Sequence, residues 1–352
     1  MTNNLSQSFP QLAERLPKVC LADLPTPADQ VSLSIGCRQR LISIKHDDQT
    51  SQLYGGNKVR KLEYLLQRAR QRNAKRIATF GTVASNHALA TALHASALQF
   101  ESICFLSHQR RNSKAPLALN MHLQNGTEIV RYGGSRADRV ATLRKYLWNR
   151  RAWVIPMGGS SWLGVVGFVN AGLELAEQIA ADRIVAPDRL YVANGTMGTS
   201  AGIALGLALA GLRTEVHAVR VTHESIANPQ AMRRLIAKTV TLLNRLDSAF
   251  PTDLGSRISL RFRDEFFGTG YAHSTSAAEH AIELAQTQLG LTLDTTYTGK
   301  AMAALLHDIQ RPQLANRSML FWNTYNSQPL PVTAERPDDT SKLPQEFLRY
   351  FE

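Results

Sequence analysis

The chain has 352 residues and a formal net charge of +12, and 44% of its residues are hydrophobic. At about 150 residues per domain this length suggests two domains, and the apolar fraction is sufficient for a large core. The basic residues are scattered over helical stretches, without an aromatic RNA-binding motif or zinc-finger spacing, so we expect a solvated basic surface and no nucleic-acid partner.

The cysteines and the apolar segments exclude other classes. Cys20, Cys37 and Cys104 are odd in number and have no CxxC spacing, which argues against a disulfide framework and a metal site. Residues 1–10 lack the basic and apolar segments of a secretory signal. The longest nearly apolar run, 201–212, is shorter than the about 20 residues that span a bilayer. We therefore expect a soluble cytoplasmic protein without a membrane partner.

Short β-rich segments alternate with helical patterns along the chain. In chain order they predict strand 41–44, helix 59–72, strand 76–80, helix 86–98, strand 102–106, helix 116–124, strand 128–130, helix 136–149, strand 153–155, helix 165–181, strand 190–193, helix 201–212 and strand 215–221. A capping box at 276–279 with Gly290 beyond it predicts a further helix, and 299–310 predicts another. This alternation predicts an α/β fold with a parallel sheet, whose ligands bind in strand-to-helix turns.

The first such turn is Gly55-Gly56-Asn57-Lys58, directly before a predicted helix. Two glycines allow unusual backbone angles and the close approach of a ligand. Lys58 falls at a helix N-terminus, where the helix dipole disfavours the ammonium form, and an imine-forming lysine needs such a lowered pKa. The alternative is one of many solvated lysines at a helix start.

Two later turns favour anions. Residues 80–87 join a strand to a helix, where small polar groups and free amides suit a carboxylate; alternatively, Ser85 is an N-cap and His87 a partly buried helix residue. Residues 194–199 form a Gly/Thr-rich loop between a strand and a helix, typical of a phosphate cup. It matches neither the Walker A loop nor the dinucleotide fingerprint, and a simple tight turn is the alternative.

Together the three turns supply a reactive lysine, an anion-binding loop and a phosphate cup, as a pyridoxal phosphate (PLP) enzyme requires. From about residue 24 to 330 the sequence resembles the 1-aminocyclopropane-1-carboxylate (ACC) deaminase and D-cysteine desulfhydrase family, most strongly in KHDD at 45–48 and GGNKVRKLE at 55–63. The resemblance implies an α/β, two-domain fold of the tryptophan synthase β-subunit type (PLP fold type II), with open, twisted, mostly parallel sheets.

The resemblance also implies roles for individual residues. Lys58 is similar to the PLP lysine, with Lys61 as its nearby rival. Asn86 is expected to contact the PLP ring oxygen, and Ser85 and its neighbours, including His87, the substrate carboxylate. The phosphate is expected at Gly195, Thr196, Met197, Gly198 and Thr199. Tyr271 and Tyr297 are expected near the substrate, Thr298 at the pyridine nitrogen and Thr324 in a later substrate loop; Lys58, Ser85, Tyr271 and Tyr297 are the candidate catalytic residues.

Two of these residues bear on the reaction. In the family, ACC ring-opening members have Glu and Leu at the positions of Thr298 and Thr324, and D-cysteine desulfhydrases have Thr at both. A neutral hydroxyl stabilises a protonated pyridine less than a carboxylate does. This pattern favours α,β-elimination, which gives pyruvate, ammonia and hydrogen sulfide, over ACC ring opening to 2-oxobutanoate and ammonia. Tyr325 and Asn326 replace two family glycines, which leaves the substrate open.

The resemblance further implies a homodimer that acts on a small amino acid. Its large domain is expected from residues 1–60 and 164–352, its small domain from 61–163, and its site from the cleft between them. Two other interpretations stay open. One is another PLP reaction on a related amino acid, such as racemisation, and the other is a non-catalytic anion-binding protein on the same fold.

Overall fold

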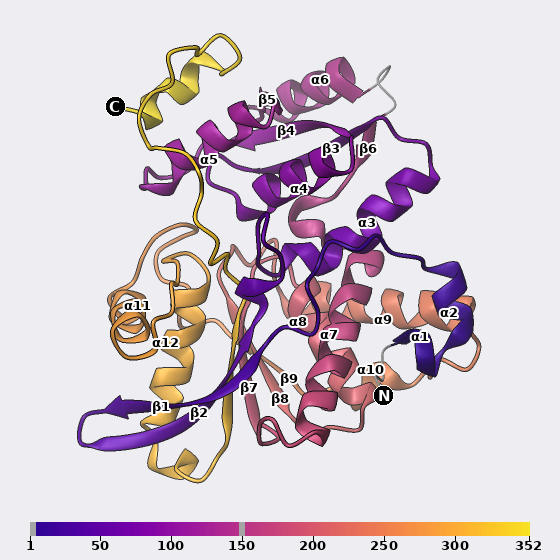
Figure 1. The fold of residues 1–352 in the computed structure, drawn as a ribbon, viewed down its shortest axis with the longest axis vertical. Coiled ribbons are helices and arrows are strands. Elements are labelled where there is room, and N and C mark those ends of the chain that lie inside the picture. Colours follow the sequence, from indigo (N-terminus) through magenta and orange to yellow (C-terminus); the bar gives the residue numbers. More distant parts are fainter. Residues whose placement is uncertain (1–4, 148–151) are drawn as a thin grey trace.

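The computed structural model describes residues 5–147 and 152–352, which form two β-sheets flanked by helices (Figure 1). In the larger sheet the strand order is β1-β2-β10-β7-β8-β9, and in the smaller it is β5-β4-β3-β6. Of the described pairs, β1 with β2 is antiparallel and the others are parallel. The strands are β1 (Ala28–Ile35), β2 (Arg38–His46), β3 (Arg76–Thr82), β4 (Glu101–Ser107), β5 (Glu128–Arg131), β6 (Ala152–Val154), β7 (Arg189–Asn194), β8 (Glu215–Arg220), β9 (Leu260–Arg263) and β10 (Met319–Asn323). The predicted α/β class with mostly parallel sheets is confirmed.

Helices cover both faces of the larger sheet because alternate strand residues point to opposite sides. Leu190 and Val192 of β7 join a buried cluster with α7 and α8, whereas Tyr191 and Ala193 join one with α11 and α12. The helices are α1 (Leu5–Ser8), α2 (Pro10–Arg15), α3 (Lys58–Gln71), α4 (Asn86–Ala97), α5 (Lys114–Gln124), α6 (Arg136–Leu147), α7 (Trp162–Ala180), α8 (Gly198–Leu209), α9 (Pro229–Leu246), α10 (Leu254–Arg257), α11 (Ser276–Leu289) and α12 (Thr298–Ile309); 3₁₀ turns lie at Asp47–Gln49, Met157–Gly159, Pro312–Leu314 and Gln345–Tyr350.

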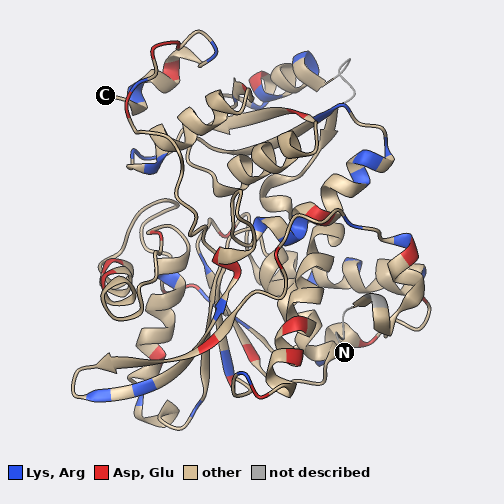
Figure 2. Cartoon of the chain, viewed as in Figure 1, with Lys and Arg blue, Asp and Glu red and all other residues tan. Residues whose placement is uncertain are grey.

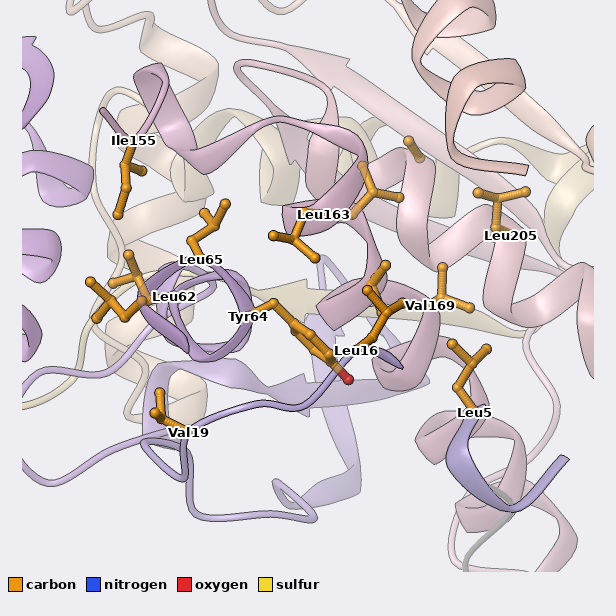
Figure 3. Close-up of a cluster of buried hydrophobic side chains, with 14 of the residues drawn as sticks. Leu5, Leu16, Val19, Leu62, Tyr64, Leu65, Ile155, Leu163, Val169 and Leu205 are labelled. Atoms are coloured by element: carbon orange, nitrogen blue, oxygen red, sulfur yellow. The ribbon is translucent and has the colours of Figure 1, made fainter. Parts of the chain in front are cut away.

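Helix α3 is anchored by the largest apolar cluster of the described residues. Leu62 and Leu65 of α3 lie in this cluster with Leu163 and Val169 of α7 and Leu205 of α8 (Figure 3). Each of these side chains is at most 7% exposed, so the cluster gives α3 a fixed position. The residue that begins α3, Lys58, is therefore held by a rigid element.

The C-terminal segment connects the two sheets. After β10 the chain leaves the larger sheet and runs to the smaller one (Figure 1). There Phe347 and Tyr350 are buried with Val83 and Leu119, and the Asn120 side chain donates to the carbonyl of Thr333 at 2.8 Å. The last part of the chain thus packs on the sheet that it does not join.

Several elements differ from the prediction. β1, β9, β10 and α9 were not predicted, although Asn228 caps α9 and Pro229 occupies its first turn, as start signals predict. In β1, Val31, Leu33 and Ile35 alternate with serines, so a period-two pattern was the available signal. The helix predicted at 136–149 is described over Arg136–Leu147, and residues 148 and 149 lie outside the described residues.

Two further expectations concern the domain division and membrane-spanning helices. The expected domain boundaries at 60/61 and 163/164 fall inside α3 and α7, so the domain division stays a prediction. Within the part of the chain that the structure describes, no helix combines the length and apolarity needed to cross a membrane. Basic and acidic residues are spread over both sheets and their helices (Figure 2).

Candidate active site

A cavity of about 330 Å³ is lined by the carboxyl ends of β3 and β7, one strand from each sheet. Ligands of α/β folds bind at such strand ends. The structure brings almost all of the predicted site residues to this cavity: Lys58, Ser85, Asn86, His87, Gly195, Thr196, Met197, Thr199, Tyr271, Tyr297, Thr298 and Thr324. Gly198 is not part of the lining, but its amide lies beside it and donates to Ser160 Oγ at 3.2 Å.

The turn before α3 presents Lys58 to the cavity. Gly56 has a φ of +93°, and a Cβ there would lie 2.9 Å from the carbonyl oxygen of Tyr325, so the turn requires glycine. Asn57 donates through its backbone to Thr324 O at 3.2 Å and through its side chain to Thr199 Oγ1 at 2.9 Å. These bonds tie the lysine turn to the loops on both sides of the cavity.

The Lys58 side chain is half-buried and its amine faces the cavity. Burial lowers its pKa from the ordinary value near 10.5 to about 8, and the carboxylate of Asp294 partly opposes this change. The sequence predicted a lowered pKa from the helix dipole, but desolvation is the larger cause. A lysine amine with a pKa near neutrality suits covalent attachment of an aldehyde and proton exchange.

The loop between β7 and α8 forms an anion cup. Met197 caps α8 with a left-handed φ of 69° and no side-chain capping bond. The Gly198 amide donates to Ser160 Oγ, and the next amides of the first helical turn remain for a ligand. Gly158 contributes the opposite wall, because a Cβ there would clash with Thr196 Oγ1. Thr196 Oγ1 lies 2.7 Å from Ser160 Oγ, so hydroxyls from two loops meet at the cup.

Lys61 also belongs to the cup, which the sequence did not predict. It lies one helical turn after Lys58 on the same face of α3. Its Nζ donates to Gly158 O at 3.2 Å and to Ser160 Oγ at 3.4 Å. Burial, and then the nearby Lys58, hold the Lys61 pKa well below its ordinary value. A bound phosphate would offset both effects on the pKa of Lys61. In the sequence, the spacing of the two lysines in KxxK was the available signal.

The Ser85-Asn86-His87 turn lies on the other side of the cavity. Ser85 caps α4 by accepting from Ala88 N at 3.2 Å, so it is both N-cap and lining residue. Asn86 Oδ1 accepts from the Tyr54 hydroxyl at 3.2 Å. His87 lies 2.9 Å from Thr79 Oγ1, and burial holds its pKa well below its ordinary value. A neutral, fixed imidazole is therefore presented to the cavity.

Two tyrosines and a threonine complete the wall. The hydroxyls of Tyr271 and Tyr297 lie 2.6 Å apart, and burial raises the pKa of both. Thr298 Oγ1 donates to Asp294 Oδ1 at 2.9 Å and accepts from the Asp294 amide at 2.9 Å. Thr298 is therefore not the isolated neutral hydroxyl expected from the sequence, because a carboxylate lies directly behind it. An Asp shortly before a helix start was the signal for Asp294.

The loop after β10 carries Thr324 and the two residues that replace family glycines. The side chain of Asn326 accepts from Gly55 N at 2.7 Å and so braces the lysine turn. The ring of Tyr325 lines the cavity, and Lys114 Nζ of α5 lies 3.8 Å from its centroid. Lys114 Nζ is also 3.8 Å from Asp294 Oδ2. Tyr325 thus receives a contact from a helix beside the smaller sheet.

Comparison with known proteins identifies the family. The model of the pyridoxal-phosphate dependent enzymes matches residues 20–324, and the chain belongs to this family. It is 32% identical over 310 residues to D-cysteine desulfhydrase from Salmonella schwarzengrund, covering 84% of this chain and 90% of that enzyme. A solved ACC deaminase homologue has a TM-score of 0.73 and 27% identity, covering 92% of this chain and 95% of that one. An L-serine ammonia-lyase from Rhizomucor miehei, at 17% identity and a TM-score of 0.58, shows the fold alone.

These matches confirm the expected family, the tryptophan synthase β-type fold and PLP as cofactor. The residues present fit PLP. A buried amine at Lys58 suits its aldehyde, and the cup with Lys61 suits its phosphate. The side-chain nitrogen of Asn194, which is buried and lines the cavity, has no hydrogen-bond partner within the described residues. A buried donor without a partner is costly, and a ligand in the cup could satisfy it.

Proposed function

We propose that this enzyme is a D-cysteine desulfhydrase-like lyase, which converts D-cysteine and water to pyruvate, ammonia and hydrogen sulfide. One observation carries the proposal: the amine of Lys58 and the cup around Thr196 open into a single cavity. PLP bound there supplies an electron sink that acidifies the α-proton of an amino acid. The relative at 32% identity that bears the name D-cysteine desulfhydrase supports this substrate.

Separate residues of the chain attach the cofactor, bind its phosphate and orient its ring. Lys58 Nζ holds the cofactor and then moves the α-proton, for which a pKa of about 8 suits it. Gly195, Thr196, Met197, Gly198 and Thr199, together with Lys61, bind the phosphate. Asn86 and Thr298 orient the ring.

The substrate side of the cavity has its own set of residues. Ser85, Asn86, His87 and Thr324 bind the substrate carboxylate. Tyr271 and Tyr297 keep their hydroxyl protons at neutral pH because burial raises their pKa, so the pair can donate a proton beside the substrate. Ser85 lies across the cavity as a second proton carrier.

ACC deaminase activity is the second candidate, and two observations favour it. The structural likeness to an ACC deaminase homologue has a TM-score of 0.73. Asp294 places a carboxylate 2.9 Å behind Thr298, where it increases the negative charge near the proposed ring position. Another PLP reaction on a related amino acid uses the same groups.

Product analysis separates the candidates. The purified protein is incubated with D-cysteine, L-cysteine and ACC, and sulfide, pyruvate and 2-oxobutanoate are measured. We expect sulfide and pyruvate from D-cysteine; 2-oxobutanoate from ACC without sulfide from D-cysteine would transfer the assignment to the second candidate. Lys58→Ala should lose the near-visible absorbance of bound PLP, whereas Lys75→Ala, an exposed lysine, should keep it. Colour retained in Lys58→Ala would contradict the attachment site.

We also infer a cytoplasmic homodimer with a large domain from residues 1–60 and 164–352 and a small domain from 61–163. The likeness to family enzymes over most of the chain supports this organisation. Size-exclusion chromatography with light scattering tests the dimer, and a monomer at micromolar concentration would contradict it.

A further inference from the structure

A second pocket lies at the opposite end of the larger sheet, away from the cavity. It has a volume of about 260 Å³ and is lined mainly by charged side chains: Arg189, Arg261, Arg263, Arg311, Asp308 and Glu265. We call it the arginine pocket. β7 begins there with Arg189 and ends at the cavity with Asn194, a rise of about 16 Å. The arginine pocket is therefore distinct from the site described above.

The strand register builds this pocket from one face of the sheet. Tyr191 pairs with His217, His217 pairs with Arg261, and Arg189 pairs with Glu215. Because alternate residues share a face, Arg189, Arg261 and Arg263 all point toward α12. Ala193 and Val219 on the same face are buried in an apolar cluster, and Arg263, the register partner of Val219, extends to Asp308. A polar patch has thus replaced the core at this end of the sheet.

Two of the four arginines, Arg189 and Arg263, form ion pairs with carboxylates. Asp308, whose side chain is 1% exposed, lies 3.0 Å from Arg189 Nη1 and 2.8 Å from Arg263 Nη1. Arg263 Nε also donates to Glu265 at 2.6 Å. These ion pairs are part of the folded scaffold, and they leave Asp308 with little capacity to neutralise a further cation.

The other two arginines keep free donors at the wall of the pocket. Arg311 approaches Asp308 only to 3.9 Å and contacts His307 Nε2 at 3.4 Å. Arg261 is exposed, and among residues 5–147 and 152–352 no carboxylate pairs with it. The two guanidinium groups come from β9 and from the segment after α12, yet they line one concavity. Guanidinium groups bind phosphate and carboxylate oxygens through paired hydrogen bonds.

We propose that the arginine pocket binds a small polyvalent oxyanion, a phosphorylated or polycarboxylate metabolite, held by Arg261 and Arg311. The volume suits a ligand of this size, close to the lower limit of ordinary small-molecule sites. Arg189 and Arg263 form the floor, where Asp308 keeps them fixed. The pocket touches β7 and α12, both of which also reach the cavity, but the proposal concerns binding alone and does not depend on the reaction.

Calorimetric titration of the PLP-bound protein in phosphate-free buffer tests the proposal, with inorganic pyrophosphate and citrate as separate probes. PLP keeps the cup near Thr196 filled. We expect saturable one-to-one binding of at least one probe, weakened about tenfold in Arg261→Ala and in Arg311→Ala, each of which loses a charge-assisted hydrogen bond. Arg139→Ala removes the same charge from an exposed position on α6 and should bind as the wild type does.

The outcomes separate the ligand classes and the alternatives. Binding of pyrophosphate alone assigns a phosphorylated ligand, and binding of citrate alone a polycarboxylate. Equal weakening in Arg139→Ala, or no saturation by either probe, would overturn the proposal. Thermal unfolding of the ligand-free protein checks that Arg261→Ala and Arg311→Ala leave the fold intact. If the protein fails to bind PLP, the proposed lyase function fails instead, while the comparison of variants still locates the anion.

Discussion

Two buried charged regions meet at the start of α3, and they differ in how their charges are compensated. Arg60 donates to Asp47 and Glu174, with distances of 2.8 to 3.1 Å, and Lys45 donates to Glu174 at 2.6 Å. Lys58 and Lys61, on the same helix, face the cavity without a carboxylate within 4.0 Å among the described residues.

The difference in charge compensation distinguishes a structural ion-pair network from a ligand-binding site. In the first region two cations and two carboxylates balance, and burial, which opposes ionisation, is outweighed by Arg60, so the pKa of Glu174 falls to about 2. In the second region burial outweighs the partial compensation of Lys58 by Asp294, and the pKa values of Lys58 and Lys61 are both lowered. Uncompensated buried charge is unfavourable until an anion arrives, which is what a cofactor phosphate provides. The following predictions test this comparison.

Asp47→Asn should have the largest effect, because it leaves Arg60 buried with half of its compensation. We expect the free energy of unfolding to fall by about 3–5 kcal/mol, as when one partner of a buried ion pair is removed. Urea unfolding followed by circular dichroism measures it. Asp23→Asn makes the same chemical change at an exposed position and should have little effect. An equal decrease in the free energy of unfolding in the two variants would contradict a stabilising role of the Arg60 ion pairs.

Lys58→Met should instead increase the free energy of unfolding of the cofactor-free protein. The folded-state pKa of about 8 lies below the ordinary value near 10.5, so the folded state binds protons less readily. The wild type should be less stable than the variant by about 3 kcal/mol below pH 8. This gap should shrink as the pH rises from 8 toward 10.5 and vanish above it. Urea unfolding at several pH values measures the gap, with Lys75→Met as control; a gap that does not change with pH contradicts the assignment.

Lys61→Met should separate cofactor binding from folding. Loss of a charge-assisted bond to phosphate should weaken PLP binding by about ten- to a hundredfold, while the cofactor-free protein becomes more stable. Absorbance titration with PLP and urea unfolding measure the two effects. Lys61→Arg keeps the cation and should recover part of the affinity. Unchanged PLP affinity in Lys61→Met would remove Lys61 from the cup.

The sequence predicted the parts of this molecule that local pattern determines. Most of the parallel strands and the three turns follow from residue spacing, although the apolar strand β10 was not predicted. Lys58 was predicted as reactive, but the cause, burial, depends on loops more than 200 residues away, such as that of Thr324. The role of KHDD at 45–48 could not be predicted from the sequence either. Lys45 and Asp47 belong to the network of compensated charges, which only the tertiary fold assembles.

The residues that sequence reasoning missed share one property. Beyond the position of Asp294 before a helix, Asp294 and Lys114 belong to no motif, and they act through the groups that they contact. Asp294 is brought to Lys58 by α12, and Lys114 is brought to Asp294 and Tyr325 from a helix beside the other sheet. Such pairings depend on the arrangement of the two sheets, which the local spacing of residues does not encode.

Tyr325→Gly should have the smallest effect and sharpens the comparison at the substrate side. It removes a ring that lines the cavity and a cation–π contact with Lys114, so the free energy of unfolding should fall by about 1 kcal/mol. The wider cavity should hold D-cysteine less firmly, with a higher KM, while larger D-amino acids gain relative to it in kcat/KM. Tyr325→Phe keeps the ring and should preserve the wild-type preference, because ring volume and not the hydroxyl fills the space. If Tyr325→Gly leaves the ratio of kcat/KM values unchanged, the ring supports the loop but does not select the substrate, and the specificity must reside in Thr324 and the Ser85 turn.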